Sequence, residues 1–160
     1  MSWHVLYLRP RSEKKVAELC AARGLEYYLP LRTETKIYQR RKVTVEIPMF
    51  PGYFFVSFER EDRTHLLQTN HVISIIVPPS ENVLVHQLDQ VRQALAIDPT
   101  LGTIEALREG RHVRIRGGAF MGVEGVIESA RGSGTVRLNV ELIGQAVAVD
   151  VDRDFVELID

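Results

Sequence analysis

The chain is poor in cysteine and in long apolar segments, and both shortages narrow what it can be. Cys20 is the single cysteine among 160 residues, which excludes an internal disulfide and a cysteine-rich metal site and fits a reducing cytosol. No apolar run approaches the ~20 residues that a membrane-spanning helix needs, and no signal peptide is evident. We therefore expect a cytoplasmic protein with one medium-sized or two small domains.

Motifs for catalysis and for metal binding are also missing. The five histidines show no close ligand spacing, and the sequence His-Glu-x-x-His does not occur. Residues 150–154 begin like a calcium loop, but Phe155 stands where such a loop needs glycine. Cys20 lies on the apolar side of a predicted helix, which favours packing over a nucleophilic role. We expect no enzymatic activity, no metal and no cofactor.

The formal net charge of -1 hides an uneven distribution along the chain. Residues 1–42 hold ten Lys and Arg against four Asp and Glu, whereas the remainder holds ten against seventeen. A basic front end on an acidic remainder indicates contact with a polyanion through one region only.

The stretch 47–58 predicts an aromatic strand with a constrained entry. Pro48 and Pro51 exclude a helix, and Gly52 allows a bend. From Tyr53 onward aromatic and β-branched residues favour a strand, in which Phe54, Val56 and Phe58 share one face and Tyr53, Phe55 and Ser57 the other. Because both faces are apolar, the strand is either covered twice, or covered once and offered to a partner.

The first 96 residues predict an α+β layer with helices on one face of a mainly antiparallel sheet. The expected strands cover 3–8, 27–31 and 72–77, and a hairpin is expected with arms 33–38 and 43–47 around a basic tip. The expected helices cover 12–23, 59–68 and 84–96. Turn residues without periodicity predict a linker at 97–108. Five short strands then follow at 111–116, 123–129, 135–142, 145–151 and 155–158, which predicts a small five-stranded β-barrel at 109–160.

Two separate stretches resemble one known family. Met49-Phe50-Pro51-Gly52-Tyr53-Phe54-Phe55-Val56 resembles the signature strand of the NusG amino-terminal (NGN) domain. Residues 110–126, with Val113-Arg114-Ile115, Gly117 and Gly122-Val123-Glu124-Gly125, resemble a KOW motif. The opening residues 2–7 and the closing residues 149–151 also match. The resemblance implies an NGN domain at 1–96 and a KOW barrel at 109–160; the short linker and acidic second half are more similar to specialised RfaH-like paralogues than to the general factor.

The resemblance implies a transcription elongation or antitermination factor. Its first domain would bind the clamp helices of RNA polymerase and suppress pausing or termination, and its KOW domain would recruit a ribosomal protein or the Rho terminator. The expected polymerase-binding residues are Tyr7, Met49, Phe50, Tyr53, Phe55, Thr64 and His65. Thr64-His65-Leu66 stands where RfaH-like relatives carry His-Thr-Thr, a pattern that it does not reproduce.

The apolar area of the aromatic side chains also supports a binding surface at Tyr7, Tyr53 and Phe55. Each aromatic side chain can bury ~150–250 Å², so three exposed rings reach the size at which an apolar patch indicates a partner. We expect Tyr53→Ala or Phe55→Ala to weaken polymerase binding while the domain stays folded. The alternative is that these rings form a second layer of core.

Two basic groups are candidate nucleic-acid contacts, for non-template or upstream DNA, although either could be an ordinary solvated surface. The first is Trp3, Arg9, Arg11, Lys14 and Lys15, and the second is the hairpin tip with Arg40, Arg41 and Lys42.

In the KOW domain, Phe120 and Ile143 are the expected partner-binding residues; Ile143 stands where the general factor has an aromatic residue. Four glycines between 117 and 125 argue against a helical form of this domain, so we expect a constitutive barrel. We also expect the protein to be a monomer. The alternative function is a stand-alone RNA- or ribosome-binding KOW module. The sequence does not indicate a target operon, a recruiting DNA element, an autoinhibitory role for the KOW domain, or whether the factor opposes or promotes termination.

Overall fold

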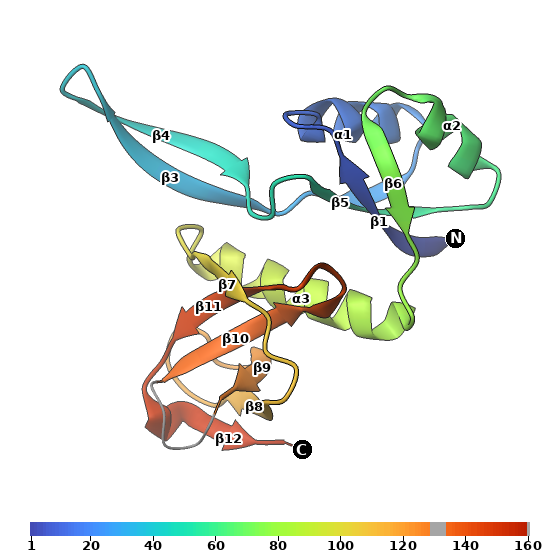
Figure 1. Cartoon of the computed structure of the whole chain (residues 1–160). Helices are drawn as coiled ribbons and strands as arrows, with labels where there is room; N and C mark the ends of the chain where they lie inside the picture. Colours follow the sequence, from blue (N-terminus) through green and yellow to red (C-terminus); the bar gives the residue numbers. More distant parts are fainter. Residues whose placement is uncertain (129–133, 160) are drawn as a thin grey trace. The chain divides into compact units, whose positions relative to one another are not determined.

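The computed structural model describes residues 1–128 and 134–159, which form two compact units (Figure 1). The first unit comprises residues 1–30 and 48–85, and the second comprises residues 31–47 and 86–160. Ser129, the last residue of one predicted strand, lies outside the described residues. The fold class is α+β, with antiparallel sheets and, among the described residues, three α-helices.

The aromatic strand lies inside the sheet of the first unit. This sheet has the order β2-β5-β1-β6 and is antiparallel at each pairing. Its strands are β2 (Glu26–Tyr28), β5 (Tyr53–Phe58), β1 (Ser2–Leu8) and β6 (Val72–Ile76). The strands predicted at 3–8 and 72–77 are confirmed. The strand predicted at 27–31 is only partly right, because β2 ends at Tyr28 and Leu31 begins another strand.

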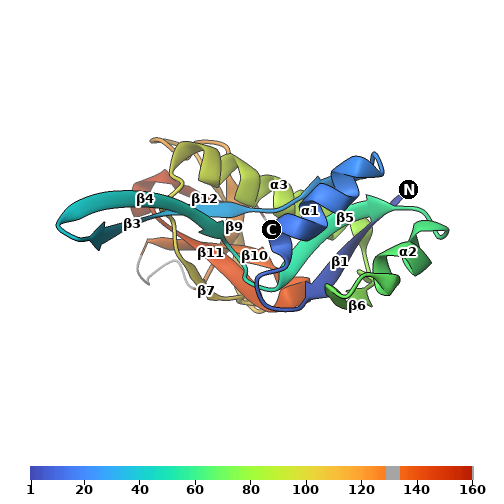
Figure 2. The same ribbon diagram turned by 90° about the horizontal axis from the view of Figure 1, so that it is seen from above.

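Two helices cover one face of this sheet. Helix α1 (Glu13–Ala22) and helix α2 (Asp62–Gln68) contribute Val16, Cys20 and Leu66 to a core that also holds Phe54, Val56 and Phe58 of β5. The two helices can be followed beside β1, β5 and β6 in Figure 2. The predicted division of β5 into two faces is therefore confirmed for this side. We call the opposite surface of the sheet the tyrosine face. Strand register places on it Trp3, Val5, Tyr7, Glu26, Tyr28, Tyr53, Phe55, Ser57, Ser74 and Ile76.

The predicted hairpin is a two-stranded ribbon of β3 (Leu31–Tyr38) and β4 (Arg41–Pro48) (Figure 1). Its turn is Gln39-Arg40, and both residues have positive φ, 49° and 65°. Two such residues fit the turn type that matches the twist of paired strands. The turn is thus shorter than predicted, since Arg41 and Lys42 already belong to β4. Near the other end of the ribbon, the backbone N–H of Thr33 donates to the carbonyl of Pro99 over 2.7 Å.

The second unit contains a six-stranded sheet with the order β12-β8-β9-β10-β11-β7. The strands are β7 (Thr103–Glu105), β8 (Arg111–Ile115), β9 (Glu124–Ile127), β10 (Thr135–Val140), β11 (Gln145–Asp150) and β12 (Val156–Leu158). Short 3₁₀ turns, η1 (Glu141–Ile143) and η2 (Arg153–Phe155), stand on either side of β11. All five predicted strands are present. The predicted linker is wrong at residues 103–105, because these residues pair with β11. Within the described residues no pairing joins β7 to β12, so the sheet is open and a closed barrel is not shown.

Helix α3 (Glu81–Ile97) is held to this sheet by two glutamines of the second unit. The Gln90 side chain is buried, and its Oε1 accepts a hydrogen bond of 2.8 Å from the backbone N–H of Glu124. Gln87 Oε1 accepts in the same way from Glu141, over 3.0 Å. These bonds satisfy backbone groups that would otherwise need water. The helix predicted at 84–96 is confirmed, but its attachment to the second sheet was not predicted.

Candidate functional site

Two tyrosines form an aromatic pair on the tyrosine face. Tyr7 of β1 and Tyr53 of β5 stand opposite each other in the strand register. Their ring centroids are 5.3 Å apart with an angle of 44° between the planes, within the usual range for an attractive aromatic pair. Tyr7 is 41% exposed and Tyr53 is partly exposed. The structure thus brings together two residues that the sequence predicted as polymerase contacts.

The turn before β5 holds this pair in place. Gly52 has φ +88°, and a Cβ added there would lie 3.3 Å from the Tyr7 ring, so the glycine allows the ring to lie against the backbone. The Gly52 carbonyl accepts a hydrogen bond of 2.8 Å from the Leu8 N–H. The Gly52 N–H donates to Oε2 of Glu13, a buried carboxylate, over 3.3 Å. The sequence did not indicate this contact, because Glu13 and Gly52 are distant from each other along the chain.

The other predicted aromatic contacts are buried. Phe55 is 0% exposed, and Met49 and Phe50 are also buried. The Phe50 ring meets the Phe55 ring edge-on, with centroids 6.5 Å apart. The expectation that Phe55 is exposed beside Tyr7 and Tyr53 is therefore wrong. Its side chain lies on the tyrosine face but is covered there, and Phe50 packs against it from the segment that precedes β5.

Three further residues of the tyrosine face were missed by sequence reasoning. Tyr28 is paired with Phe55, Ser74 with Tyr7, and Ile76 with Val5, and all three are partly exposed. Paired residues on neighbouring strands share a face of the sheet. Only the register of long-range pairing reveals this arrangement, which a single sequence does not show.

Thr64 and His65 lie elsewhere. Both are exposed residues of α2. The next residue, Leu66, packs into the core on the opposite side of the sheet from the tyrosine face. The structure therefore does not place Thr64 and His65 with the tyrosine pair, and they belong to a separate surface.

The predicted basic and aromatic group is divided between two ends of β1. Arg9 and Arg11 lie in the loop after this strand, and Lys14 and Lys15 lie in the first turn of α1, all exposed. Trp3 lies near the start of the strand. Six residue steps separate Trp3 from Arg9, which is about 20 Å in an extended strand. The ring of Trp3 therefore does not lie with these four cations.

Three of these four cations lie at unfavourable positions. Arg11 has φ 60°, which is uncommon for a residue other than glycine. Lys14 and Lys15 stand at the positive end of the α1 dipole, where cations are disfavoured.

The hairpin tip is the second basic group, and it is exposed along its length. Arg40, Arg41 and Lys42 are all exposed, as are Ile37 at 77% and Tyr38 at 69%. Arg40 keeps a left-handed backbone at a position where glycine is preferred. Exposed apolar side chains beside three cations provide surface for a partner.

In the second sheet the two predicted partner contacts are both partly buried. Phe120 lies in the loop between β8 and β9, and Ile143 lies in η1 before Gly144, which has φ +67°. A ring that was not predicted covers the same loop: a Cβ added at Gly117 would lie 2.7 Å from Phe155. Phe155 is 40% exposed and extends the apolar surface there.

The single cysteine, Cys20, is buried. Burial raises the pKa of the Cys20 thiol to about 11, although nearby Arg23 lowers it slightly, and a thiol with so high a pKa is a poor nucleophile. Among residues 1–128 and 134–159, no group of three His, Cys, Asp or Glu side chains could hold a metal ion. No helix in that part of the chain has the length and apolar character to cross a membrane.

Comparison with known proteins identifies the family. A crystal structure titled as conformation B of the MjSpt4:Spt5 complex aligns with a TM-score of 0.33 and 17% identity, covering 98% of this chain and 96% of that one. Residues 1–95 match the NusG family, described as "Transcription termination factor nusG". This match spans more than half of the 160 residues. The chain therefore belongs to the NusG family of transcription factors.

Proposed function

We propose that this protein is a transcription elongation or antitermination factor that binds the clamp helices of RNA polymerase through its tyrosine face. Membership of the NusG family supports a role in transcription. The family is one of transcription factors, and this function is carried by binding rather than by catalysis. In this proposal the bound factor suppresses pausing or termination.

One observation carries the proposal, namely the exposed pairing of Tyr7 with Tyr53. Their ring centroids lie 5.3 Å apart with the planes tilted by 44°, and neither ring is fully covered. Tyrosine combines a large apolar ring with a polar hydroxyl, a combination that is enriched at protein interfaces. Gly52 and Glu13 fix the turn under the pair, so the site needs little ordering on binding. Phe55 acts as the floor of the site rather than as a contact.

Binding to core RNA polymerase tests this proposal with the full chain. Tyr7→Ala with Tyr53→Ala is the test variant, and Tyr27→Ala is the control. Tyr27 is matched because it is 37% exposed and stacks at 5.4 Å on Phe54, a residue of the other sheet face. We expect the double variant to weaken binding at least about tenfold, as for interface hot spots, and Tyr27→Ala to bind like the wild type. Equal binding by all three proteins would exclude the tyrosine face as the site.

We also propose that the two basic groups contact DNA near the polymerase. The four cations of the β1–α1 loop and first turn of α1 would meet phosphates, and the hairpin tip would reach the upstream duplex. Such contacts release counterions, so affinity should fall steeply with added salt. Replacing Arg40, Arg41 and Lys42 with Gln should flatten that dependence. An unchanged salt slope would remove the hairpin from the DNA contact.

The second sheet is proposed to be a KOW domain that recruits a further partner, with Phe120 and Ile143 as contacts. The proposed division is an NGN domain at 1–96, a connection at 97–108 and a KOW domain at 109–160. The RfaH-like assignment remains part of this proposal, with Thr64 and His65 as a second polymerase contact. If the full chain binds a ribosomal protein or RNA but never core polymerase, it is instead a stand-alone KOW module.

A further inference from the structure

The segment between helix α3 and strand β8 is hydrogen-bonded to other parts of the second unit along most of its length. Residues 97–108 have the composition of a linker, yet they lie wholly within the second unit. Residues 103–105 form β7, which pairs with β11. We call residues 98–108 the strap. A free linker leaves its backbone N–H and C=O groups to water, so the partners of these groups show whether the strap is a linker.

The strap is bonded to β11 and to the turn that precedes it. The backbone N–H of Ala148 donates to the Gly102 carbonyl over 3.0 Å, at the residue before β7 begins. On the other side of β7, the Ala106 N–H donates to the Gly144 carbonyl over 3.1 Å. The short pairing of β7 with β11 is therefore continued by a backbone hydrogen bond at each end.

Two side chains of β10 hold the second half of the strap. Asn139 is 4% exposed, and its Oδ1 accepts a hydrogen bond of 3.0 Å from the Leu107 N–H. Its Nδ2 donates to the Leu107 carbonyl over 2.6 Å, so the amide satisfies both backbone groups of one residue. Two residues earlier on β10, Nη1 of Arg137 donates to the Glu105 carbonyl over 2.9 Å. Breaking the buried Asn139 contact would leave polar groups without partners, which is costly.

The first half of the strap is bonded to the base of the β3–β4 hairpin. The backbone N–H of Thr33 donates to the Pro99 carbonyl over 2.7 Å, and Nε of Arg32 donates to the Leu101 carbonyl over 3.2 Å. Both donors belong to β3 and are partly buried. Within the described part of the chain, β3 and β4 pair only with each other. Because a two-stranded ribbon is marginally stable by itself, the strap supports the hairpin where it begins.

We propose that the strap fastens the β3–β4 hairpin to the six-stranded sheet, so that the two move as one rigid body. A flexible segment of residues 97–108 would instead have a root-mean-square end-to-end distance of about 20 Å, and the hairpin and the sheet would change their separation on a similar scale. The functional consequence rests on the proposed function. The DNA contact at the hairpin tip and the partner contact on the sheet would be held at a fixed separation, so a partner bound to the sheet would orient the hairpin.

Residual dipolar couplings of backbone N–H groups test the proposal in the full chain. They are measured for the hairpin, residues 31–47, and for the six-stranded sheet, and each set is fitted to its own alignment tensor. We expect the two tensors to have the same size and orientation, because the strap makes both elements one body. A hairpin tensor that is smaller, as averaging by a flexible linker produces, or that is rotated from the sheet tensor would overturn the proposal.

Hydrogen exchange tests the individual bonds of the strap. The amides of Thr33 and Ala148 donate to strap carbonyls, and the amides of Ala106 and Leu107 donate from the strap. We expect all four to exchange within about tenfold of the amides that pair β10 with β11, as in one cooperative unit. Exchange of the Thr33 or Leu107 amide at the rate of an unfolded chain would overturn the proposal.

Arginine variants at the two ends of the strap complete the test. Arg32→Ala should speed exchange of the Thr33 amide, and Arg137→Ala that of the Ala106 amide, each about two- to tenfold, the effect of one hydrogen bond. Arg116→Ala is the matched control, because its guanidinium donates to a main-chain carbonyl over the same 2.9 Å outside the strap. It should leave both amides unchanged. Unaltered exchange in both test variants, or equal effects of Arg116→Ala, would overturn the proposal.

These measurements use the full chain alone, without polymerase, DNA or a partner of the second sheet. A chain that fails to bind any of them would refute the proposed function and leave the rigid body in place. Independent motion of the hairpin and the sheet would refute the rigid body and leave the tyrosine face unaffected. The two proposals can therefore fail separately.

Discussion

Replacing Phe55 with alanine tests whether its ring stabilises the fold or contacts a partner directly. The Phe55 side chain is fully buried and meets Phe50 edge-on at 6.5 Å. Removing a buried phenylalanine ring costs about 3–5 kcal/mol, from lost apolar burial and from the cavity that remains. A domain of this size has a free energy of unfolding of about 5–15 kcal/mol. We therefore expect Phe55→Ala to remove a large share of the stability of the first unit.

The matched comparison is Tyr53→Ala, whose side chain lies two residues earlier on the same face and is partly exposed. We expect a loss of about 1 kcal/mol for this change, the usual size for a residue outside the core. The single tryptophan, Trp3, lies in the first unit. Its fluorescence during urea unfolding therefore reports on that unit.

The expected order of midpoints is wild type, then slightly lower Tyr53→Ala, then much lower Phe55→Ala. A Phe55→Leu variant should lie between the last two, because most of the buried volume is kept. If Phe55→Ala unfolds at the wild-type urea concentration, the ring is not part of the core, and the interpretation of the tyrosine face is wrong. Reduced polymerase binding by Phe55→Ala would then reflect a direct contact, as the sequence first indicated.

Three other predictions concern the turn, an ion pair and the thiol. Gly52→Ala should destabilise the first unit by about 1 kcal/mol or more, because of its φ of +88° and the nearby Tyr7 ring, and a midpoint equal to wild type would refute this. The hydrogen bond from Arg23 lowers the pKa of Asp62 below 3.8, so the pair stabilises the fold above that pH and its contribution is lost as the pH falls through the lowered value. Asp62→Asn should therefore cost under about 1 kcal/mol of unfolding free energy at pH 7 and progressively less in acid, and a cost that does not change with pH would contradict the assignment. The buried Cys20 thiol, with its pKa raised to about 11, should resist iodoacetamide at pH 8 in the folded protein and react in urea; rapid labelling of the folded protein would show that it is accessible.

Local signals in the sequence predicted the elements of the first unit well. Ser12 and Gly24 bound the helix that the structure shows at Glu13–Ala22, and Gly24 has the positive φ expected after a helix. Alternation in the aromatic strand predicted which side chains lie under α1 and α2. These features depend on residues near one another in sequence, for which periodicity and turn chemistry are informative.

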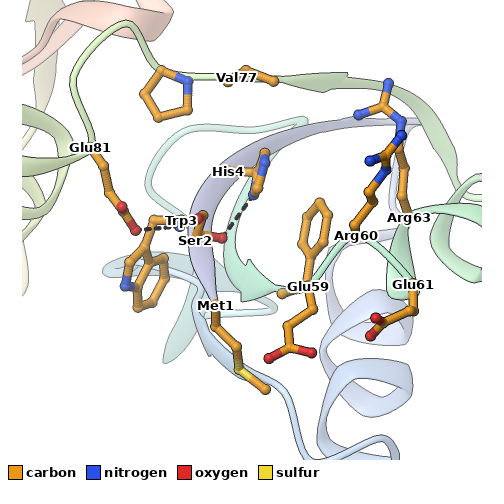
Figure 3. A pocket seen from close by; sticks show the side chains of 12 residues that line it. Met1, Ser2, Trp3, His4, Glu59, Arg60, Glu61, Arg63, Val77 and Glu81 are labelled. Carbon is orange, nitrogen blue, oxygen red and sulfur yellow. Dashed lines mark hydrogen bonds between the residues drawn. The ribbon is translucent and has the colours of Figure 1, made fainter.

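Features that depend on long-range pairing were not predicted. Residues 103–105 were assigned to a linker because the segment has turn chemistry, yet they pair with β11 about forty residues later. The burial of Phe55 depends on packing by Phe50, and alternation alone cannot distinguish a buried ring from an exposed one. A cavity lined by Trp3, Phe58 and Glu81 (Figure 3) is formed by three segments that are distant in the sequence, within residues 1–4, 58–63 and 77–81. A single sequence does not show that these segments meet.

The affinity of the full chain for core RNA polymerase, measured with and without the tyrosine pair, shows whether the tyrosine face is the docking surface. Labelled protein is titrated with core enzyme, and wild type is compared with the Tyr7→Ala, Tyr53→Ala double variant and with Tyr27→Ala. We expect an affinity loss of at least about tenfold for the double variant and none for Tyr27→Ala. Trp3 fluorescence should show that both variants are folded. Wild-type affinity in the folded double variant would contradict this expectation.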